Sequence, residues 1–234
     1  MLVAHAADFH LGRFLRSAER REDFLDAFWE LVEKVLEAKP RLLILAGDIF
    51  DAPRPPTREI LEALRGVGRL TSEAIEVVAI AGNHDRVAHA GDVSPVELLR
   101  EAGAKVLRWR EELEIEGVQF LGGPYVPNEK LLSELLEEAA SRAKKPSVLV
   151  LHQGISGIVP QGKLHITDEI LNSFTYIALG HYHKPKDWGR FAYPGSTEHY
   201  DASEAGDPKG FYLFDLERPE EKEFVRLARV RPHI

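Results

Sequence analysis

The chain has no cysteine, so its 234 residues form no disulfide and offer no thiolate to a metal ion. It also lacks a long apolar run, since no stretch approaches the ~20 residues needed to cross a bilayer. The first residues, Met1 to His5, have neither the basic nor the apolar segment of a signal peptide. A soluble cytoplasmic protein is therefore expected, in which histidine, carboxylate and amide groups must hold any metal ion.

The chain also has fewer basic than acidic residues. The formal net charge of -8 at pH 7 argues against a protein that coats nucleic acid without specificity, because such binding depends on lysine and arginine. An enzyme acting on nucleic acid is not excluded, since bound divalent cations reverse the local charge where a phosphate sits. No break in composition divides the chain, so a single domain over 1–234 is expected.

The sequence does contain short polar segments in a fixed order. They are Asp8-Phe9-His10, Gly47-Asp48-Ile49-Phe50-Asp51, Gly82-Asn83-His84-Asp85, His152-Gln153-Gly154 and Gly180-His181-Tyr182-His183. Each follows an apolar run of strand length; the runs are 2–6, 42–46, 75–80, 148–151 and 176–179. Open α/β sheets place their sites at the carboxyl ends of strands, so these polar segments are expected to meet at one edge.

Helical periodicity fills several gaps between the expected strands. Residues 17–38 carry apolar side chains at i, i+3, i+4 and i+7, which predicts an amphipathic helix packed on a sheet. Ser94-Pro95 followed by Glu97 is a capping box and predicts a helix start. The other expected elements are helices over 57–70, 94–102 and 128–144 and short strands over 211–214 and 223–230. An α/β fold follows.

The residue types in the polar segments suit a pair of divalent cations. Asp48 follows a glycine that allows close backbone approach, and its two carboxylate oxygens can bridge two ions. A mixed oxygen and imidazole set favours manganese, iron or zinc over calcium or magnesium, and two such ions activate water for phosphoester hydrolysis. The predicted ligands are Asp8, His10 and His183 for one ion, Asn83, His152 and His181 for the other, and Asp48 for both.

His84 lies one residue beyond a predicted ligand, and its expected role is to protonate the leaving alkoxide or stabilise charge on the phosphate. Asp51 is expected to orient the His84 ring and to favour its imidazolium form. For Asp85, catalysis and support of the turn stay equally open. His5, within the first strand, is expected to be a packed, hydrogen-bonded core residue. Three basic residues adjoin the polar segments, as candidates either for phosphate contacts or for solvated charges: Arg13, Arg86 and Lys184.

These segments, taken with their flanking residues, resemble the calcineurin-like metallophosphoesterase superfamily. Within it they are similar to SbcD and the Mre-type nucleases of DNA double-strand-break repair. The resemblance runs nearly end to end. Its discriminating parts are His152-Gln153-Gly154 and Tyr193-Pro194-Gly195-Ser196, where small phosphodiesterases of the superfamily usually have different residues.

The resemblance implies a four-layer αββα sandwich, in which two central mixed sheets are flanked by helices. It also implies manganese dependence, exonuclease activity on DNA ends and endonuclease activity on single strands. A homodimer and a partnership with an SMC-like ABC ATPase of the SbcC or Rad type are implied as well. The dimer would use the helices after the second and third polar segments, with ordinary core packing as the alternative; the candidate residues are Leu61, Leu64, Val96 and Leu99.

The chain departs from the family pattern at two places. Archaeal members tend to carry a histidine where this chain has Asp51, so an Asp51–His84 dyad is expected in place of a pair of histidines. The chain also ends at Arg231-Pro232-His233-Ile234, which resembles the end of the family's nuclease core. The resemblance thus implies that a DNA-capping domain and an ATPase-binding tail are absent.

Two other functions stay open on the sequence alone. The first is a phosphodiesterase or phosphatase for nucleotides or other small phosphoesters, which would use the same ligand set. The second is a non-catalytic scaffold that dimerises and docks an ATPase, against which the complete ligand set argues.

Overall fold

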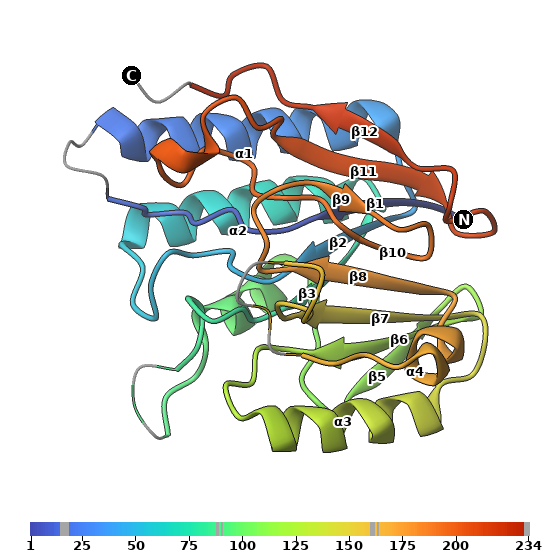
Figure 1. The fold of residues 1–234 in the computed structure, drawn as a ribbon. Helices are drawn as coiled ribbons and strands as arrows, with labels where there is room; N and C mark the ends of the chain where they lie inside the picture. The colour runs from blue at the N-terminus through green and yellow to red at the C-terminus, as the bar shows by residue number, and fades with distance from the viewer. Residues whose placement is uncertain (15–18, 88, 90, 160–161, 163, 232–234) are drawn as a thin grey trace.

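Two six-stranded sheets lie face to face in the computed structural model, which describes residues 1–14, 19–87, 89, 91–159, 162 and 164–231. Helices cover the outer side of each sheet (Figure 1). Three separate apolar cores lie between the successive layers of helix, sheet, sheet and helix. The predicted four-layer αββα fold is therefore confirmed.

The first sheet has the strand order β12-β11-β1-β2-β3-β4. Its strands are β1 (Leu2–Ala6), β2 (Leu42–Ala46), β3 (Glu76–Ile80), β4 (Lys105–Val106), β11 (Gly210–Asp215) and β12 (Glu223–Arg226). Strands β1 to β4 run parallel to one another, whereas β11 runs antiparallel to both β1 and β12. The parallel strands β1, β2 and β3 thus deliver the first three polar segments to one edge of the sheet.

The second sheet has the order β5-β6-β7-β8-β10-β9. Its strands are β5 (Glu112–Ile115), β6 (Val118–Gly123), β7 (Ser147–His152), β8 (Tyr176–Gly180), β9 (Lys186–Asp187) and β10 (Phe191–Tyr193). Strands β6, β7, β8 and β10 run parallel, and the outer strands β5 and β9 run antiparallel to their neighbours. His152 pairs with Gly180, so the last two polar segments leave this sheet side by side.

Strands β5 and β6 form a hairpin that the sequence analysis did not predict. Glu116 and Gly117 connect them with φ values of 50° and 79°. Two consecutive residues with positive φ are typical of the tight turn whose twist matches that of paired strands. The alternation in Glu112–Ile115 was present in the sequence, but four residues carry too short a pattern to identify a strand.

Helices α1 (Glu19–Ala38), α2 (Thr57–Ser72) and η1 (Pro95–Ala102) cover the first sheet, and α3 (Glu129–Arg142) and α4 (Asp168–Ser173) cover the second. A short turn, η2 (Ala202–Glu204), follows β10. Residues 17 and 18, predicted to begin the first helix, lie outside the described residues. Within the described part of the chain, no helix combines the length and hydropathy of a membrane span.

The predicted capping box at Ser94 is only half present. Ser94 Oγ accepts a hydrogen bond from Val96 N at 3.3 Å, as a helix cap should. Glu97, however, binds Arg100 and Arg108 instead of turning back to Ser94, and the helix that follows is a 3-10 helix. Two nearby guanidinium groups thus compete successfully for the glutamate.

Strand β2 explains why continuous apolar runs precede the polar segments. Leu43 and Leu45 pack toward the helices, while Leu42 and Ile44 pack into the layer between the sheets. Both faces of the strand are buried, as in most parallel sheets, so no polar alternation is possible. Full burial of each such side chain contributes about 1.5–3 kcal/mol.

His5 joins the two sheets through a polar contact inside this apolar layer. Its Nδ1 lies 2.9 Å from Tyr176 Oη and its Nε2 lies 3.1 Å from Leu179 O. A carbonyl only accepts, so Nε2 carries the proton and Tyr176 donates to Nδ1. The ring is therefore neutral, and burial lowers the pKa of His5 to about 3. The prediction of a packed, hydrogen-bonded core histidine is confirmed.

The lowered pKa of His5 should make the free energy of unfolding fall in acid. Between its unfolded pKa of 6.5 and its folded pKa of about 3, only the unfolded chain takes up the proton. The free energy of unfolding should therefore decrease by about 2 kcal/mol between pH 8 and pH 5 through this one group. For His5→Gln, the decrease in the free energy of unfolding between these pH values should be smaller than that of the wild type by the same amount, as measured by urea unfolding at both pH values.

His165 provides the matched control because it is exposed. His165→Gln should retain the pH dependence of the wild-type protein. An equal loss of stability in acid for His5→Gln and the wild type would contradict the neutral, buried state of His5.

Candidate metal centre

The five polar segments meet at one edge of the sandwich, between the two sheets. Three sets of side chains bring their ligand atoms within 4.8 Å of one another: Asp8, His10 and His183; Asp8, Asp48 and His152; His10, Asp48 and His84. Asn83 and His181 adjoin these sets through contacts with His152 and with each other. We call the following seven residues the polar cluster: Asp8, His10, Asp48, Asn83, His152, His181 and His183.

Backbone hydrogen bonds lock the first two segments together. Asp8 N donates to Gly47 O at 3.0 Å, Phe9 N donates to Asp48 O at 2.8 Å, and His10 N donates to Asp48 O at 3.0 Å. Four members of the cluster have positive φ values: Asp8 (55°), His10 (48°), Asp48 (50°) and His181 (97°). Such conformations cost about 1–3 kcal/mol each, and these hydrogen bonds help to offset the cost.

Glycines in the segments are required by close packing. A Cβ on Gly82 would lie 2.1 Å from Asp48 Oδ1, and one on Gly180 would lie 2.0 Å from Ala46 O. Both distances are far below van der Waals contact, so any larger residue would displace Asp48 or β2. These glycines allow strands of both sheets to place their ends within one small volume.

On one side of the cluster, His10 Nε2 and His183 Nε2 lie 3.1 Å apart. His183 Nδ1–H donates to Glu204 Oε1 at 2.6 Å, and His10 Nδ1 lies 3.2 Å from Asp51 Oδ1. Glu204 holds the His183 proton on Nδ1. When His10 also carries its proton on Nδ1, beside the Asp51 carboxylate, the two Nε2 atoms present lone pairs to each other. Two facing lone pairs repel, so the arrangement fits a cation bound by both rings.

On the other side, His152 Nδ1–H donates to Ala46 O at 2.7 Å, which leaves Nε2 as an acceptor when the ring is neutral. That Nε2 lies 3.2 Å from Asn83 Oδ1 and 3.3 Å from Asp48 Oδ2. His181 Nδ1 lies 2.9 Å from the same Asn83 oxygen. Oxygen and imidazole acceptors therefore converge here too, and this donor set fits a manganese, iron or zinc ion.

Asp48 faces both sides of the cluster. Its Oδ2 lies 3.3 Å from His152 Nε2 and 3.9 Å from His10 Nε2. Its Oδ1 accepts a hydrogen bond from His84 N at 2.8 Å, and Asp8 similarly accepts from His181 N at 3.0 Å. Backbone N–H groups thus hold both buried carboxylates in place. The position of Asp48 suits the bridging role predicted for it.

Burial and charge shift the pKa values within the cluster. Burial lowers the pKa of His10, and burial together with the charge of His152 lowers that of His181 to about 3. Although burial opposes it, the Asp48 carboxylate raises the pKa of His152 to about 9. Burial raises the pKa of Asp8. The carboxylates therefore require positive charge beside them, which a proton on His152 or a metal cation supplies.

Asp51 and His84 are in contact, but not as the predicted dyad. His84 Nδ1–H donates to the backbone carbonyl of Asp51 at 3.0 Å, whereas the Asp51 carboxylate lies 3.8 Å from that nitrogen. The carboxylate instead lies 3.2 Å from His10 Nδ1 and 3.6 Å from Arg13 Nη1. This corrects the sequence-based assignment: the Asp51 backbone orients His84, and the Asp51 side chain faces His10.

Asp85 supports the turn. It is fully buried, and its carboxylate accepts hydrogen bonds from Ile49 N (2.9 Å), Phe50 N (2.7 Å) and Gly82 N (3.1 Å). The bonds from Ile49 N and Phe50 N tie the third polar segment to the second, and the bond from Gly82 N closes the turn within the third. Of the two roles left open for Asp85, the geometry favours the structural one.

The three basic candidates differ in placement. The Arg13 guanidinium stacks on Tyr200, with 3.7 Å between the guanidinium carbon and the ring centroid. The Tyr200 ring in turn lies 4.5 Å from His10 and 5.0 Å from His183, centroid to centroid. Lys184 pairs with Asp207 at 3.2 Å, and Arg86 is exposed. Arg13 is thus the basic candidate that adjoins the cluster.

Sequence reasoning missed three residues that contact the cluster. Glu204 binds His183, Tyr200 packs against His10, and the Tyr125 ring stacks on His181 with centroids 5.8 Å apart. Tyr125 and Glu204 lie in segments without a recognisable motif, and Tyr200 follows the Tyr-Pro-Gly-Ser turn by four residues. Only their spatial proximity identifies them.

The dimer candidates are divided by burial. Val96 and Leu99 are fully buried in the core between η1 and the first sheet, so neither offers surface to a second copy. Leu64 is partly buried against the same core. Leu61 is exposed, as is Leu98 on the outer side of η1. The structure thus corrects the prediction for Val96 and Leu99, which serve the core.

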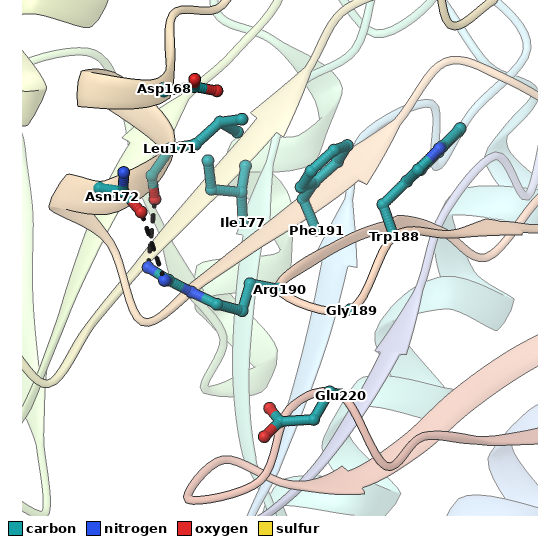
Figure 2. Close-up of a pocket in the computed structure, with 9 residues that line it drawn as sticks. All are labelled: Asp168, Leu171, Asn172, Ile177, Trp188, Gly189, Arg190, Phe191 and Glu220. Carbon is teal, nitrogen blue, oxygen red and sulfur yellow. Dashed lines mark hydrogen bonds between the residues drawn. The ribbon is translucent and has the colours of Figure 1, made fainter.

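A separate cavity of about 390 Å³ lies beside the β9–β10 hairpin and α4 (Figure 2). Trp188, Phe191 and Ile177 form an apolar row, while Arg190 donates to Asn172 Oδ1 and Leu171 O. None of the residues lining it belongs to the polar cluster. The cavity therefore has no part in the candidate metal centre.

Comparison with known proteins identifies similar sequences. A sequence model of the calcineurin-like phosphoesterase family matches residues 1–185. The DNA double-strand break repair proteins Mre11 of Methanocaldococcus jannaschii and Methanococcus maripaludis are each 34% identical over 92% of this chain and 63% of their own length. Mre11 of Archaeoglobus fulgidus is 34% identical over 94% of this chain and 58% of its length. The chain thus spans 58% to 63% of these relatives.

The fold also matches a solved structure. The crystal structure of TT1561 of Thermus thermophilus aligns with a TM-score of 0.60 and covers 96% of this chain and 98% of the other. The two sequences are 12% identical, so this likeness concerns the fold alone.

Asp85→Asn should destabilise the protein, because one carboxylate oxygen becomes an amide N–H that faces a backbone donor. The unsatisfied groups should cost about 1–3 kcal/mol. For a chain of this size the melting temperature should fall by about 3–10 °C, as measured by differential scanning calorimetry. Asp92→Asn is the matched control, since Asp92 accepts one backbone N–H at 3.2 Å while partly exposed.

The control should melt within about 2 °C of the wild type. A catalytic role for Asp85 would be shown by the opposite pattern, in which Asp85→Asn melts normally but loses hydrolytic activity.

Proposed function

The chain belongs to the calcineurin-like phosphoesterase family, and from this premise we propose that it is the nuclease core of a DNA double-strand-break repair enzyme. The observation that carries the proposal is the polar cluster, in which two sheets bring three oxygen-donor and four imidazole side chains together. Similarity to proteins named for DNA double-strand break repair supports DNA as the substrate. The proposed domain covers 1–234.

We assign two divalent cations, most readily manganese, to the cluster. Asp8, His10 and His183 would hold one ion and Asn83, His152 and His181 the other, while Asp48, which faces both groups, would serve both. When bound, such ions stabilise negative charge on the phosphate and lower the pKa of a water that attacks phosphorus. Iron and zinc suit the same ligands.

His84 is the proposed proton donor. Hydrolysis of a phosphodiester breaks the bond between phosphorus and the leaving oxygen, which needs a proton as it departs. His84 Nδ1 is occupied by the Asp51 carbonyl, so the proton is delivered from Nε2. The side chain is 31% exposed, which gives a substrate access to it. Arg13, held by Tyr200 and Asp51, is placed to contact a phosphate oxygen of the strand.

Two segments that favour a nuclease over a small phosphodiesterase pack against each other. Tyr193 Oη donates to Gln153 O at 2.7 Å and accepts from Ile155 N at 3.2 Å. Gln153 Nε2 also donates to Val126 O at 3.0 Å. The Tyr-Pro-Gly-Ser turn therefore holds the His152-Gln153-Gly154 segment. Their joint presence supports the DNA-repair branch of the family as the better match.

The proposal extends to partners. A homodimer would use the surface around the exposed residues Leu61 of α2 and Leu98 of η1. In the complete assembly an SMC-like ABC ATPase of the Rad type would act with the nuclease on DNA ends. Exonuclease action on ends and endonuclease action on single strands belong to the same proposal.

The direct test compares DNA with a small ester. With manganese, the purified chain should degrade a labelled duplex from its ends and cut a single-stranded circle, and a chelator should stop both reactions. Its kcat/KM should be higher on DNA than on bis-p-nitrophenyl phosphate. Asp48→Ala should lower DNA hydrolysis about 10³-fold, since it removes several kcal/mol of stabilisation by the metal centre.

Asp168→Ala is the control, because Asp168 borders the separate cavity beside α4. It should retain wild-type rates. Turnover of the small ester with none on DNA would instead support the phosphodiesterase alternative, and a manganese-loaded but inert protein would support the scaffold.

His84→Gln should separate proton transfer from metal binding. Loss of a general acid should lower kcat on DNA by about 10²–10⁴-fold, while the manganese content and KM stay close to wild type. Steady-state kinetics and elemental analysis of the same preparations measure both quantities. His89→Gln, at an exposed histidine in the same loop, should behave as the wild type. A parallel loss of manganese in His84→Gln would make His84 a ligand and not an acid.

A further inference from the structure

The ring of His183 is held by a buried ion pair that no sequence motif marked. Glu204 Oε1 accepts the His183 Nδ1–H at 2.6 Å, and Glu204 Oε2 binds Lys209 Nζ and accepts from Tyr200 N at 3.0 Å. Lys209 is 2% exposed. Burial opposes ionisation of Glu204, but the hydrogen bond and charge of His183 and the charge of Lys209 lower its pKa to about 2.

The backbone of His183 is held by the same group of residues. Lys209 Nζ donates to His183 O at 3.2 Å and to Ser196 Oγ at 2.6 Å, while Ser196 N donates to His183 O at 3.2 Å. Gly195 has a φ of 80°, and a Cβ there would lie 2.7 Å from His183 O. The Tyr-Pro-Gly-Ser turn thus packs directly on the His183 carbonyl, which gives its last two residues a structural purpose.

The two halves of the cluster differ in what supports their histidines. His183 and His10 each have a carboxylate beside Nδ1, at 2.6 Å and 3.2 Å. His152 instead donates its Nδ1–H to the neutral carbonyl of Ala46 at 2.7 Å. A carboxylate partner makes an imidazole a stronger donor to a metal than a carbonyl partner does, and it also fixes the ring.

We infer that Glu204, anchored by Lys209 and Ser196, is a positioning residue. It makes the cation position beside His183 and His10 bind its ion more tightly than the position beside Asn83, His152 and His181. The inference rests on the proposed two-ion centre. The first ion then enters between Asp8, His10 and His183. The half with Asn83, His152 and His181 fills at higher metal concentration.

Calorimetric titration of the metal-free chain with manganese tests this inference. The wild type should show two binding constants that differ by about tenfold or more, since a partner of a ligating histidine is worth about 10–100-fold in affinity. Glu204→Gln should weaken the tighter constant by about 10–100-fold and leave the weaker one within about threefold. His183→Ala should remove the tighter class, and Asn83→Ala the weaker.

Two further variants control for indirect effects of the Glu204 substitution. Glu204→Gln leaves Lys209 unpaired in the interior, so the double variant Glu204→Gln/Lys209→Met, which removes both charges, should show the same selective loss with an intact melting transition. Asp201→Asn is the control in the same loop. The Asp201 carboxylate accepts hydrogen bonds from Ser203 N and Ser203 Oγ, so this substitution should leave both constants unchanged.

The outcomes separate this inference from the proposed function. Two equal constants in the wild type, or an equal fall of both in Glu204→Gln and in the double variant, would overturn the inference while leaving a two-ion centre in place. A wild-type chain that binds no manganese would overturn the proposed centre itself.

Discussion

Burial of the Asp8 and Asp48 carboxylates in one small volume is the constraint on which the rest of the site depends. Both are almost completely inaccessible to solvent, and burial, together with the charge of Asp48, raises the pKa of Asp8. At an effective dielectric constant near 20, two like charges 4 Å apart repel by about 4 kcal/mol. Four imidazoles and the backbone N–H groups of His84 and His181 surround them. In the proposed two-ion centre, the bound cations would supply the remaining compensation.

The architecture supplies the rigidity that such an arrangement needs. Parallel strands of both sheets end at a common edge. Three residues before Asp8, the His5 side chain connects the two sheets through its contacts with Tyr176 and Leu179. Residues with positive φ aim the first two carboxylates inward, and hydrogen bonds between the first two polar segments hold that strained backbone. Asp85 then fastens the third segment to the second, so the site is a set of interlocked loops on a stiff frame.

The sheet strands and the meeting of the polar segments could be predicted from the sequence. Apolar runs that are buried on both faces indicate parallel strands, and such strands expose polar residues only at their ends. Side-chain direction could not be predicted in the same way. Asp51 is one residue in a loop, and sequence spacing does not decide whether its carboxylate or its carbonyl meets His84. Val96 and Leu99 share the helical spacing of a surface stripe, yet packing against α2 buries them. Glu204 reaches His183 through a loop that carries no periodic pattern.

The central claim is that one edge of this sandwich holds two cations between named side chains. Anomalous diffraction from crystals soaked in manganese, recorded at the manganese edge, tests it most directly. Two peaks are expected, one contacted by Asp8, His10 and His183 and the other by Asn83, His152 and His181, with Asp48 reaching both. A single peak at saturating manganese, or peaks outside the polar cluster, would contradict it.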